Sequence, residues 1–96
     1  MEFGASHSAM ERHLTAAIRY LRQPPIVGLN GRASQGFQYD TGNHFVVVQG
    51  VYGLGERFMI NDPWGGFVGR HAWIRYEVSS GVLFQAYSNV NLGYAW

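Results

Sequence analysis

The sequence has no cysteine, no lysine and few charged residues. The lack of cysteine excludes disulfides, thiolate metal ligands and a cysteine nucleophile within these 96 residues. All seven basic residues are arginine, which fits a GC-rich genome better than selection against lysine-directed ubiquitination in a host cell. Charged residues make up 14% of the chain, against roughly 25% in an average domain. This shortfall indicates that a partner or a missing segment normally covers part of the surface, and an uncovered apolar face would favour self-association.

The same composition disfavours several further classes of protein. A net charge of +1 creates no field that attracts nucleic acid or anionic lipid. No apolar run approaches the ~18 residues of a membrane span, and no particular compartment is indicated. Residues 1–8 lack the basic start and apolar stretch of a signal peptide, so we interpret them as a leader or an appended segment. Residues 9–96 are expected to form one domain, and its scattered histidines predict neither a metal site nor a cofactor.

The first predicted element is a helix over residues 8–22. Ser8 is a suitable N-cap, and Glu11 three residues later completes a capping box. Apolar residues recur at helical spacing through this segment. Pro24 and Pro25 then end the helix.

The rest of the chain is typical of short antiparallel strands. Strands are predicted over residues 26–29, 44–52, 56–61, 71–78 and 82–88, with an edge strand in the tail 89–96. Residues 30–43 are rich in Gly, Ser, Asn and Gln and predict a loop. The expected fold class is therefore α+β, with one N-terminal helix packed on a curled antiparallel sheet of about five strands.

His44 and Asp62 lie on the two arms of one predicted hairpin, nearly equidistant from its turn. If Gly53 is the centre of the turn, the two residues face each other directly, about 5 Å apart. If residues 53–55 form the loop, they are diagonal neighbours on one face, ~7–8 Å apart. A register shifted by one residue would instead place them on opposite faces of the sheet.

A carboxylate beside an imidazole fixes the tautomer and orientation of the ring and stabilises its protonated form. These two groups are the base and the orienting group of a nucleophile–base–orienter triad. The alternative is a surface histidine that lies near a turn aspartate, since Asp-Pro commonly opens a turn. The choice between the two depends on the register of the hairpin.

Two motifs flank this pair: GNHFVVV at residues 42–48 and NDPWG at residues 61–65. With the preceding helix, the PPIV strand and the polar loop, they resemble the second half of papain-like cysteine peptidases over roughly residues 9–69. The closest resemblance is to the bacterial branch that includes bacteriocin-processing domains of peptide exporters and secreted effectors. It implies a papain-like half-domain of a secreted or injected bacterial protein, such as a toxin, that acts on a peptide or protein substrate.

The resemblance also implies a role for each residue of the motifs. His44 would be the general base and acid, and Asp62 its orienting group. Trp64 would shield their hydrogen bond from water, Asn43 would shape the rim of the cleft, and Gly65 would contribute to the same substrate-binding region.

The chain departs from this family in having no nucleophilic cysteine and no glutamine-containing helix upstream to carry it. The main expectation is therefore a fragment, processed subunit or split half whose partner is the missing cysteine-bearing half. A second interpretation is a catalytically inactive peptidase-like module that binds a peptide or a partner protein. A third is a small carbohydrate-binding β domain that uses exposed aromatic side chains.

Overall fold

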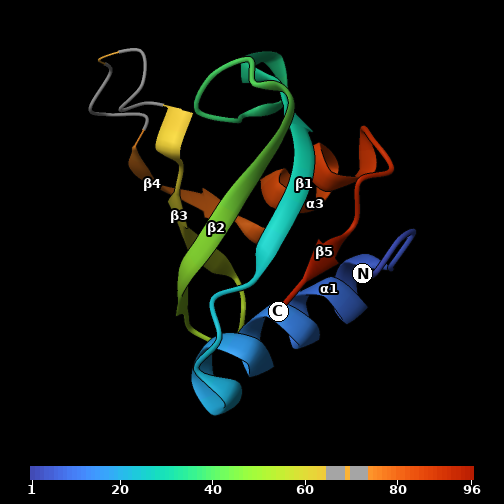
Figure 1. Ribbon diagram of the computed structural model, residues 1–96, viewed down its shortest axis with the longest axis vertical. Helices are drawn as coiled ribbons and strands as arrows, with labels where there is room; N and C mark the ends of the chain where they lie inside the picture. Colours follow the sequence, from blue (N-terminus) through green and yellow to red (C-terminus); the bar gives the residue numbers. More distant parts are fainter. Residues whose placement is uncertain (65–68, 70–73) are drawn as a thin grey trace.

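A computed structural model describes residues 1–64, 69 and 74–96 of the chain. These residues form an open, five-stranded antiparallel sheet with two α-helices packed on it, which confirms the α+β class (Figure 1). The strand order is β4-β3-β2-β1-β5, so β4 and β5 are the edges. The elements are α1 (His7–Ala16), η1 (Ala17–Leu21), β1 (Ile26–Gly31), η2 (Ala33–Gln35), β2 (Gly42–Tyr52), β3 (Arg57–Asn61), β4 (Arg75–Ser79), α3 (Ser80–Ser88) and β5 (Tyr94–Ala95).

The first helix begins earlier than predicted, and its cap is a different residue. The side chain of Ser6 caps α1 by accepting a hydrogen bond from the backbone N–H of Ala9 at 3.2 Å. The predicted capping box of Ser8 and Glu11 is wrong, because the Glu11 carboxylate accepts a hydrogen bond from a serine hydroxyl on α3 instead. The helix continues as the π-helical turn η1 and ends before Arg22, whose φ of 54° is left-handed. The paired prolines then lead into β1 as expected.

The strand predicted over residues 82–88 is wrong, because this segment is the helix α3. Ser79, which the sequence placed between two predicted strands, caps it by accepting a hydrogen bond from the backbone N–H of Val82 at 3.2 Å. The buried residues Leu83, Ala86 and Tyr87 follow helical spacing. A segment of seven residues is too short for its apolar pattern to distinguish a strand from a helix. Packing of the buried face of α3 against β1 favours the helix.

Both ends of the chain are held at the same side of the sheet (Figure 1). β5 pairs with β1, so the tail forms the predicted edge strand. Glu2 forms a β-bridge with Tyr94 of this strand, and the backbone N–H of Ala5 donates to the hydroxyl of Tyr87 at 3.0 Å. Residues 1–8, which the sequence indicated as a leader, therefore contact the domain and begin its first helix.

Gly31 lets the loop between β1 and β2 pack closely on the sheet. A Cβ atom at this position would lie 2.3 Å from the ring of Phe37, which is buried. The Phe37 ring in turn contacts Tyr76 of β4 edge-on, with ring centroids 5.7 Å apart. The absent side chain at Gly31 thus fixes how the loop approaches the inner face of the sheet.

We expect Gly31→Ala to lower the free energy of unfolding by about 1–3 kcal/mol, because the new methyl group overlaps a buried ring. Urea denaturation followed by circular dichroism measures this change. Gly81→Ala is the matched control: it lies in the first turn of α3, where the nearest heavy atom is 4.0 Å from an added Cβ. We expect this control to stabilise the protein by about 0.5–1 kcal/mol. Equal effects of the two variants would contradict the close-packing explanation.

Candidate functional site

A β-bulge in β2 sets the register that brings the histidine and the aspartate together. Near the turn, Tyr52 pairs with Arg57. If this register continued unchanged along the hairpin, Asp62 would lie opposite Val47. The register shifts by one residue between Val48 and Gly50, so that Val47 pairs with Asn61. Asp62 then lies diagonally across from His44 on the same face, which confirms one of the two registers that allow contact. A bulge inserts one extra residue in one strand and so reverses which face the following side chains occupy.

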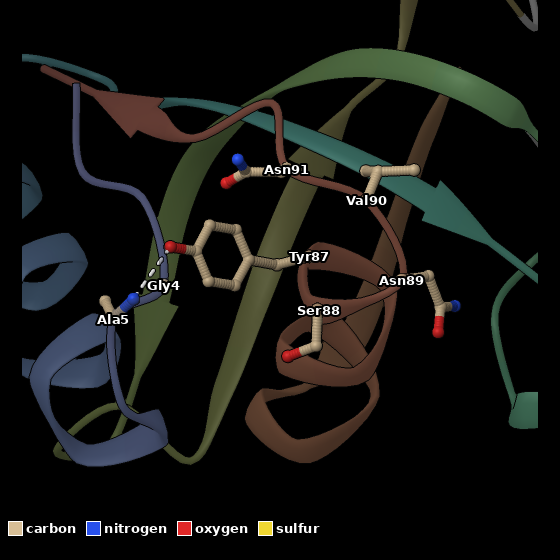
Figure 2. A pocket seen from close by; sticks show the side chains of 7 residues that line it. All are labelled: Gly4, Ala5, Tyr87, Ser88, Asn89, Val90 and Asn91. Carbon is tan, nitrogen blue, oxygen red and sulfur yellow. Dashed lines mark hydrogen bonds between the residues drawn. The ribbon is translucent and has the colours of Figure 1, made fainter.

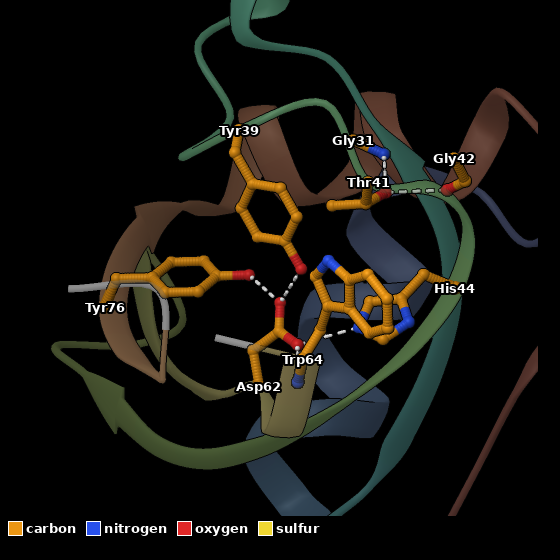
Figure 3. A network of polar contacts seen from close by, with 8 residues as sticks. All are labelled: Gly31, Tyr39, Thr41, Gly42, His44, Asp62, Trp64 and Tyr76. Atoms are coloured by element: carbon orange, nitrogen blue, oxygen red, sulfur yellow. Dashed lines mark hydrogen bonds and ion pairs between the residues drawn. The ribbon is translucent and has the colours of Figure 1, made fainter. Parts of the chain in front are cut away.

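The two side chains form a direct hydrogen bond. His44 Nε2 lies 2.7 Å from Asp62 Oδ1 (Figure 3). The carboxylate can only accept in this contact, so the imidazole carries its proton on Nε2. The side chain of Asp62 is fully buried, whereas that of His44 is 20% exposed. The carboxylate of the pair is therefore shielded from water, whereas the imidazole is partly exposed to solvent.

Four hydrogen-bond donors in the described part of the chain surround the Asp62 carboxylate (Figure 3). Oδ1 accepts from His44 and, at 3.0 Å, from the backbone N–H of Trp64. Oδ2 accepts from the hydroxyls of Tyr39 at 2.7 Å and Tyr76 at 2.8 Å. Since an ionised carboxylate offers about four lone-pair sites, both oxygens are fully used. A buried carboxylate with this many donors is stabilised without an arginine or lysine partner.

The carboxylate keeps the two phenols protonated. Burial, and then the hydrogen bond and the charge of Asp62, raise the pKa of Tyr39 and of Tyr76 above the ordinary value of 10.0. Each phenol therefore remains a hydrogen-bond donor to Asp62 at neutral pH.

We expect the free energy of unfolding to fall above pH 10, by up to about 1.4 kcal/mol per pH unit for each of the two phenols. The fold favours the protonated phenol, so this stabilisation is complete below the unfolded pKa of about 10 and is lost as pH rises towards the folded value. Urea denaturation at a series of pH values from 8 upward measures the slope. In Tyr39→Phe the slope should be smaller by the contribution of one phenol. An unchanged slope would contradict the raised pKa of Tyr39.

The exposed side of the His44 ring is where a reacting group could approach. Its Nδ1 atom has no hydrogen-bond partner among the residues that the structure describes. With the Nε2 proton held by Asp62, Nδ1 carries the free lone pair and is the basic atom of the ring. The geometry can thus accept a proton at Nδ1 and stabilise the resulting imidazolium through Asp62.

The other residues of the two motifs lie around this pair in different ways. Asn43 precedes His44 on β2, is exposed, and accepts a hydrogen bond on Oδ1 from Asn30 Nδ2 at 3.3 Å. Trp64 contacts Asp62 through its backbone, and the residue is 43% exposed. Gly65 lies outside the described residues.

Sequence reasoning missed the two tyrosines that contact Asp62. Tyr39 lay in a segment interpreted only as a loop, and Tyr76 lay in a predicted strand with no role of its own. In the structure both are buried, as are Tyr87 and Tyr94, so these four are not among the exposed aromatic side chains that a carbohydrate-binding domain would use. The strand alternation of Tyr76 with the buried Val78 was the one signal that placed it on the inner face.

A surface groove in the described part of the chain lies away from this pair. It is an open groove of about 530 Å³ between the N-terminal segment and the end of α3 (Figure 2). Neither member of the pair lines it, and its walls carry no acidic, basic or histidine side chain. The lining residues are Gly4, Ala5, Tyr87, Ser88, Asn89, Val90 and Asn91. The groove therefore supplies no acid–base chemistry.

The described residues contain no group of three or more His, Cys, Asp or Glu side chains arranged to hold a metal ion. Among them there is also no helix long and apolar enough to cross a membrane.

The fold and the site define an α+β protein with a buried aspartate that orients a partly exposed histidine. Comparisons of the chain with models of known protein families, with curated proteins and with solved structures find no match. The chemistry of the site and the motifs that surround it are therefore the features that point to a function.

Proposed function

We propose that this chain supplies the general base and its orienting carboxylate to a papain-like cysteine peptidase, with the nucleophilic cysteine on a segment outside this sequence. The observation that carries the proposal is the 2.7 Å contact between His44 Nε2 and the buried Asp62. Its support is threefold: the register of the hairpin, the fully paired carboxylate, and an Nδ1 atom of the partly exposed His44 that has no hydrogen-bond partner among the described residues. The flanking motifs, GNHFVVV and NDPWG, supply the resemblance to the family.

In this reaction the thiol of the partner's cysteine transfers its proton to Nδ1 of His44. Pairing of the thiolate with the imidazolium lowers the pKa of such a thiol to ~3–4. The thiolate attacks the peptide carbonyl, and the imidazolium returns its proton to the leaving amine as the C–N bond breaks. His44 then takes a proton from water as the water oxygen attacks the thioester carbonyl, and the C–S bond breaks to release the acid and restore the thiolate–imidazolium pair. Asp62 keeps the ring in the orientation that each of these transfers needs.

The remaining motif residues have supporting roles in the proposal. Trp64 shields the hydrogen bond between His44 and Asp62 from water, and its backbone N–H already holds the same oxygen of Asp62. Asn43 lies at the exposed end of β2 beside His44 and shapes the rim of the cleft. The low fraction of charged residues supports a surface that the cysteine-bearing half covers.

The test is to mix purified chain with a polypeptide encoded upstream of it that carries a glutamine and a following cysteine at a helix start. We expect peptide cleavage, read with a fluorogenic peptide library, only when both are present. A Cys→Ser change in the upstream polypeptide should abolish it. If a complete parent protein cleaves equally well after His44→Ala, the proposal is wrong.

A second candidate is a peptidase-like module that binds a peptide without cutting it. The observation that favours it is the absence of any cysteine from the sequence. The same mixture separates the two functions. If a library peptide binds, as seen by fluorescence anisotropy, and is not cleaved in the presence of the upstream polypeptide, the result supports the binding module. Cleavage supports the peptidase.

A further inference from the structure

Two tyrosines from distant parts of the chain hold the oxygen of Asp62 that faces away from the histidine. Tyr39 lies in the loop between η2 and β2, and Tyr76 lies on the edge strand β4. Their hydroxyls donate to Oδ2 at 2.7 and 2.8 Å (Figure 3). Each tyrosine is 6% exposed, so neither hydrogen bond has water as a ready replacement.

The two oxygens of Asp62 thereby have separate partners. Oδ1 binds His44 and the backbone of Trp64, and Oδ2 binds only the phenols among the described residues. Rotation of the carboxylate about its Cβ–Cγ bond would break at least two of these hydrogen bonds at once. The phenols therefore fix the plane of the carboxylate and with it the direction in which Oδ1 meets the imidazole.

The choice of phenols also preserves the charge of the carboxylate for the histidine. An arginine at the same position would neutralise Asp62 and weaken its stabilisation of an imidazolium. Neutral hydroxyls satisfy the buried oxygen without adding a positive charge. In the described residues, His44 is the one basic side chain that pairs with Asp62.

We propose that Tyr39 and Tyr76 are positioning residues for the pair, holding Asp62 so that Oδ1 faces His44 Nε2. Their catalytic consequence rests on the proposed peptidase function, whereas their effect on the histidine is a property of this chain alone. Tyr39 further links the loop to the site. Thr41 and Asp40 anchor that loop by accepting hydrogen bonds, both at 2.8 Å, from backbone N–H groups of Gly31 and Ala33.

The test is proton NMR of the chain with ¹⁵N-labelled histidine, read at the Nε2–H resonance of His44. His44→Gln, in which the signal disappears, assigns it. In the unmodified chain we expect a resonance protected from exchange with water, because the proton is held by a buried carboxylate. We expect about ten-fold faster exchange in Tyr39→Phe and in Tyr76→Phe, and loss of the resonance in the double variant.

Tyr87→Phe is the matched control. Tyr87 is also buried and its hydroxyl also makes two hydrogen bonds, with the backbones of Ala5 and Glu2, but it does not contact Asp62. This variant should lose stability and leave the exchange rate unchanged. If both single variants fold and exchange at the unmodified rate, or if the control changes the rate equally, the positioning role is wrong. The single variants are sufficient for this test, so it remains conclusive even when the double variant fails to fold.

The reconstituted peptidase gives a second readout. There we expect the single variants to lower kcat about ten-fold with KM unchanged, because the carboxylate acts on the histidine and does not touch the peptide. If His44→Ala leaves cleavage unchanged, the proposed function fails while the exchange measurement still decides the role of the tyrosines. If exchange is unchanged while His44→Ala abolishes cleavage, the positioning role fails by itself.

Discussion

Asp62→Ala is expected to lower the free energy of unfolding by about 3–5 kcal/mol. The change leaves two buried phenol hydroxyls without their acceptor and removes the partner of His44. It also creates a cavity where a fully buried side chain was packed. A domain of this size has only about 5–15 kcal/mol of stability in total, so this loss is a large share of it. Urea denaturation and thermal melting measure the change, and each kcal/mol corresponds to about 4–8 °C in Tm.

Two controls separate the effect of the network from that of a lost charge. Asp62→Asn keeps the shape and an acceptor for His44, and places an amide against hydroxyls that can rotate to accept. We expect it to cost about 1–2 kcal/mol. Glu77→Ala removes a carboxylate from an exposed ion pair with Arg57 and should cost less than about 1 kcal/mol. If Asp62→Ala lowers the free energy of unfolding by no more than either control does, the hydrogen bonds are not what stabilises the site.

His44→Ala is expected to lower kcat/KM of the proposed peptidase, reconstituted from this chain and its cysteine-bearing half. The expected loss is about 10²–10⁴-fold, the usual contribution of a general acid–base group. The loss should be at the upper end, because the same ring activates the thiol and protonates the leaving amine. His44→Gln separates chemistry from folding. Its amide N–H can replace Nε2–H as a donor to Asp62, but it offers no basic nitrogen.

We therefore expect His44→Gln to fold with nearly unchanged stability and to be as inactive as His44→Ala. Asn43→Ala is the neighbouring control, since Asn43 is exposed and contacts neither Asp62 nor its phenols. It should change KM more than kcat, because its proposed role is to shape the cleft. Activity retained in both histidine variants would remove His44 from the mechanism.

Much of the candidate site was accessible to sequence reasoning because hairpin geometry is local. His44 and Asp62 flank one turn, and the two-residue period of a strand limits them to either the same face or opposite faces. What decided between these outcomes was the bulge between Val48 and Gly50. A glycine within a strand is compatible with a bulge, but it does not by itself set the register. The roles of Asn43, Trp64 and Gly65 stay predictions, since they depend on a cleft that needs a second half.

The tyrosines were not predictable in the same way. Tyr39 reaches Asp62 from a loop 23 residues away, and Tyr76 from the other side, 14 residues away. The sequence does not distinguish a tyrosine that packs in the core from one whose hydroxyl donates to a buried carboxylate, because the two differ only in their hydrogen-bond partner. The packing of Phe37 over Gly31 and against Tyr76, together with the hydrogen bonds of Thr41 and Asp40, holds the loop against the sheet.

The sequence by itself determined the α+β class, the central strands, the helix before the paired prolines and the two residues that form the pair. These features depend on short-range periodicity and on turn residues, which the chain displays directly. The tertiary structure decided that residues 80–88 are a helix, that the register places His44 and Asp62 on one face, and that two phenols hold the carboxylate. Each of these depends on contacts between residues far apart in the chain, whose energies outweigh local preference once the core is formed.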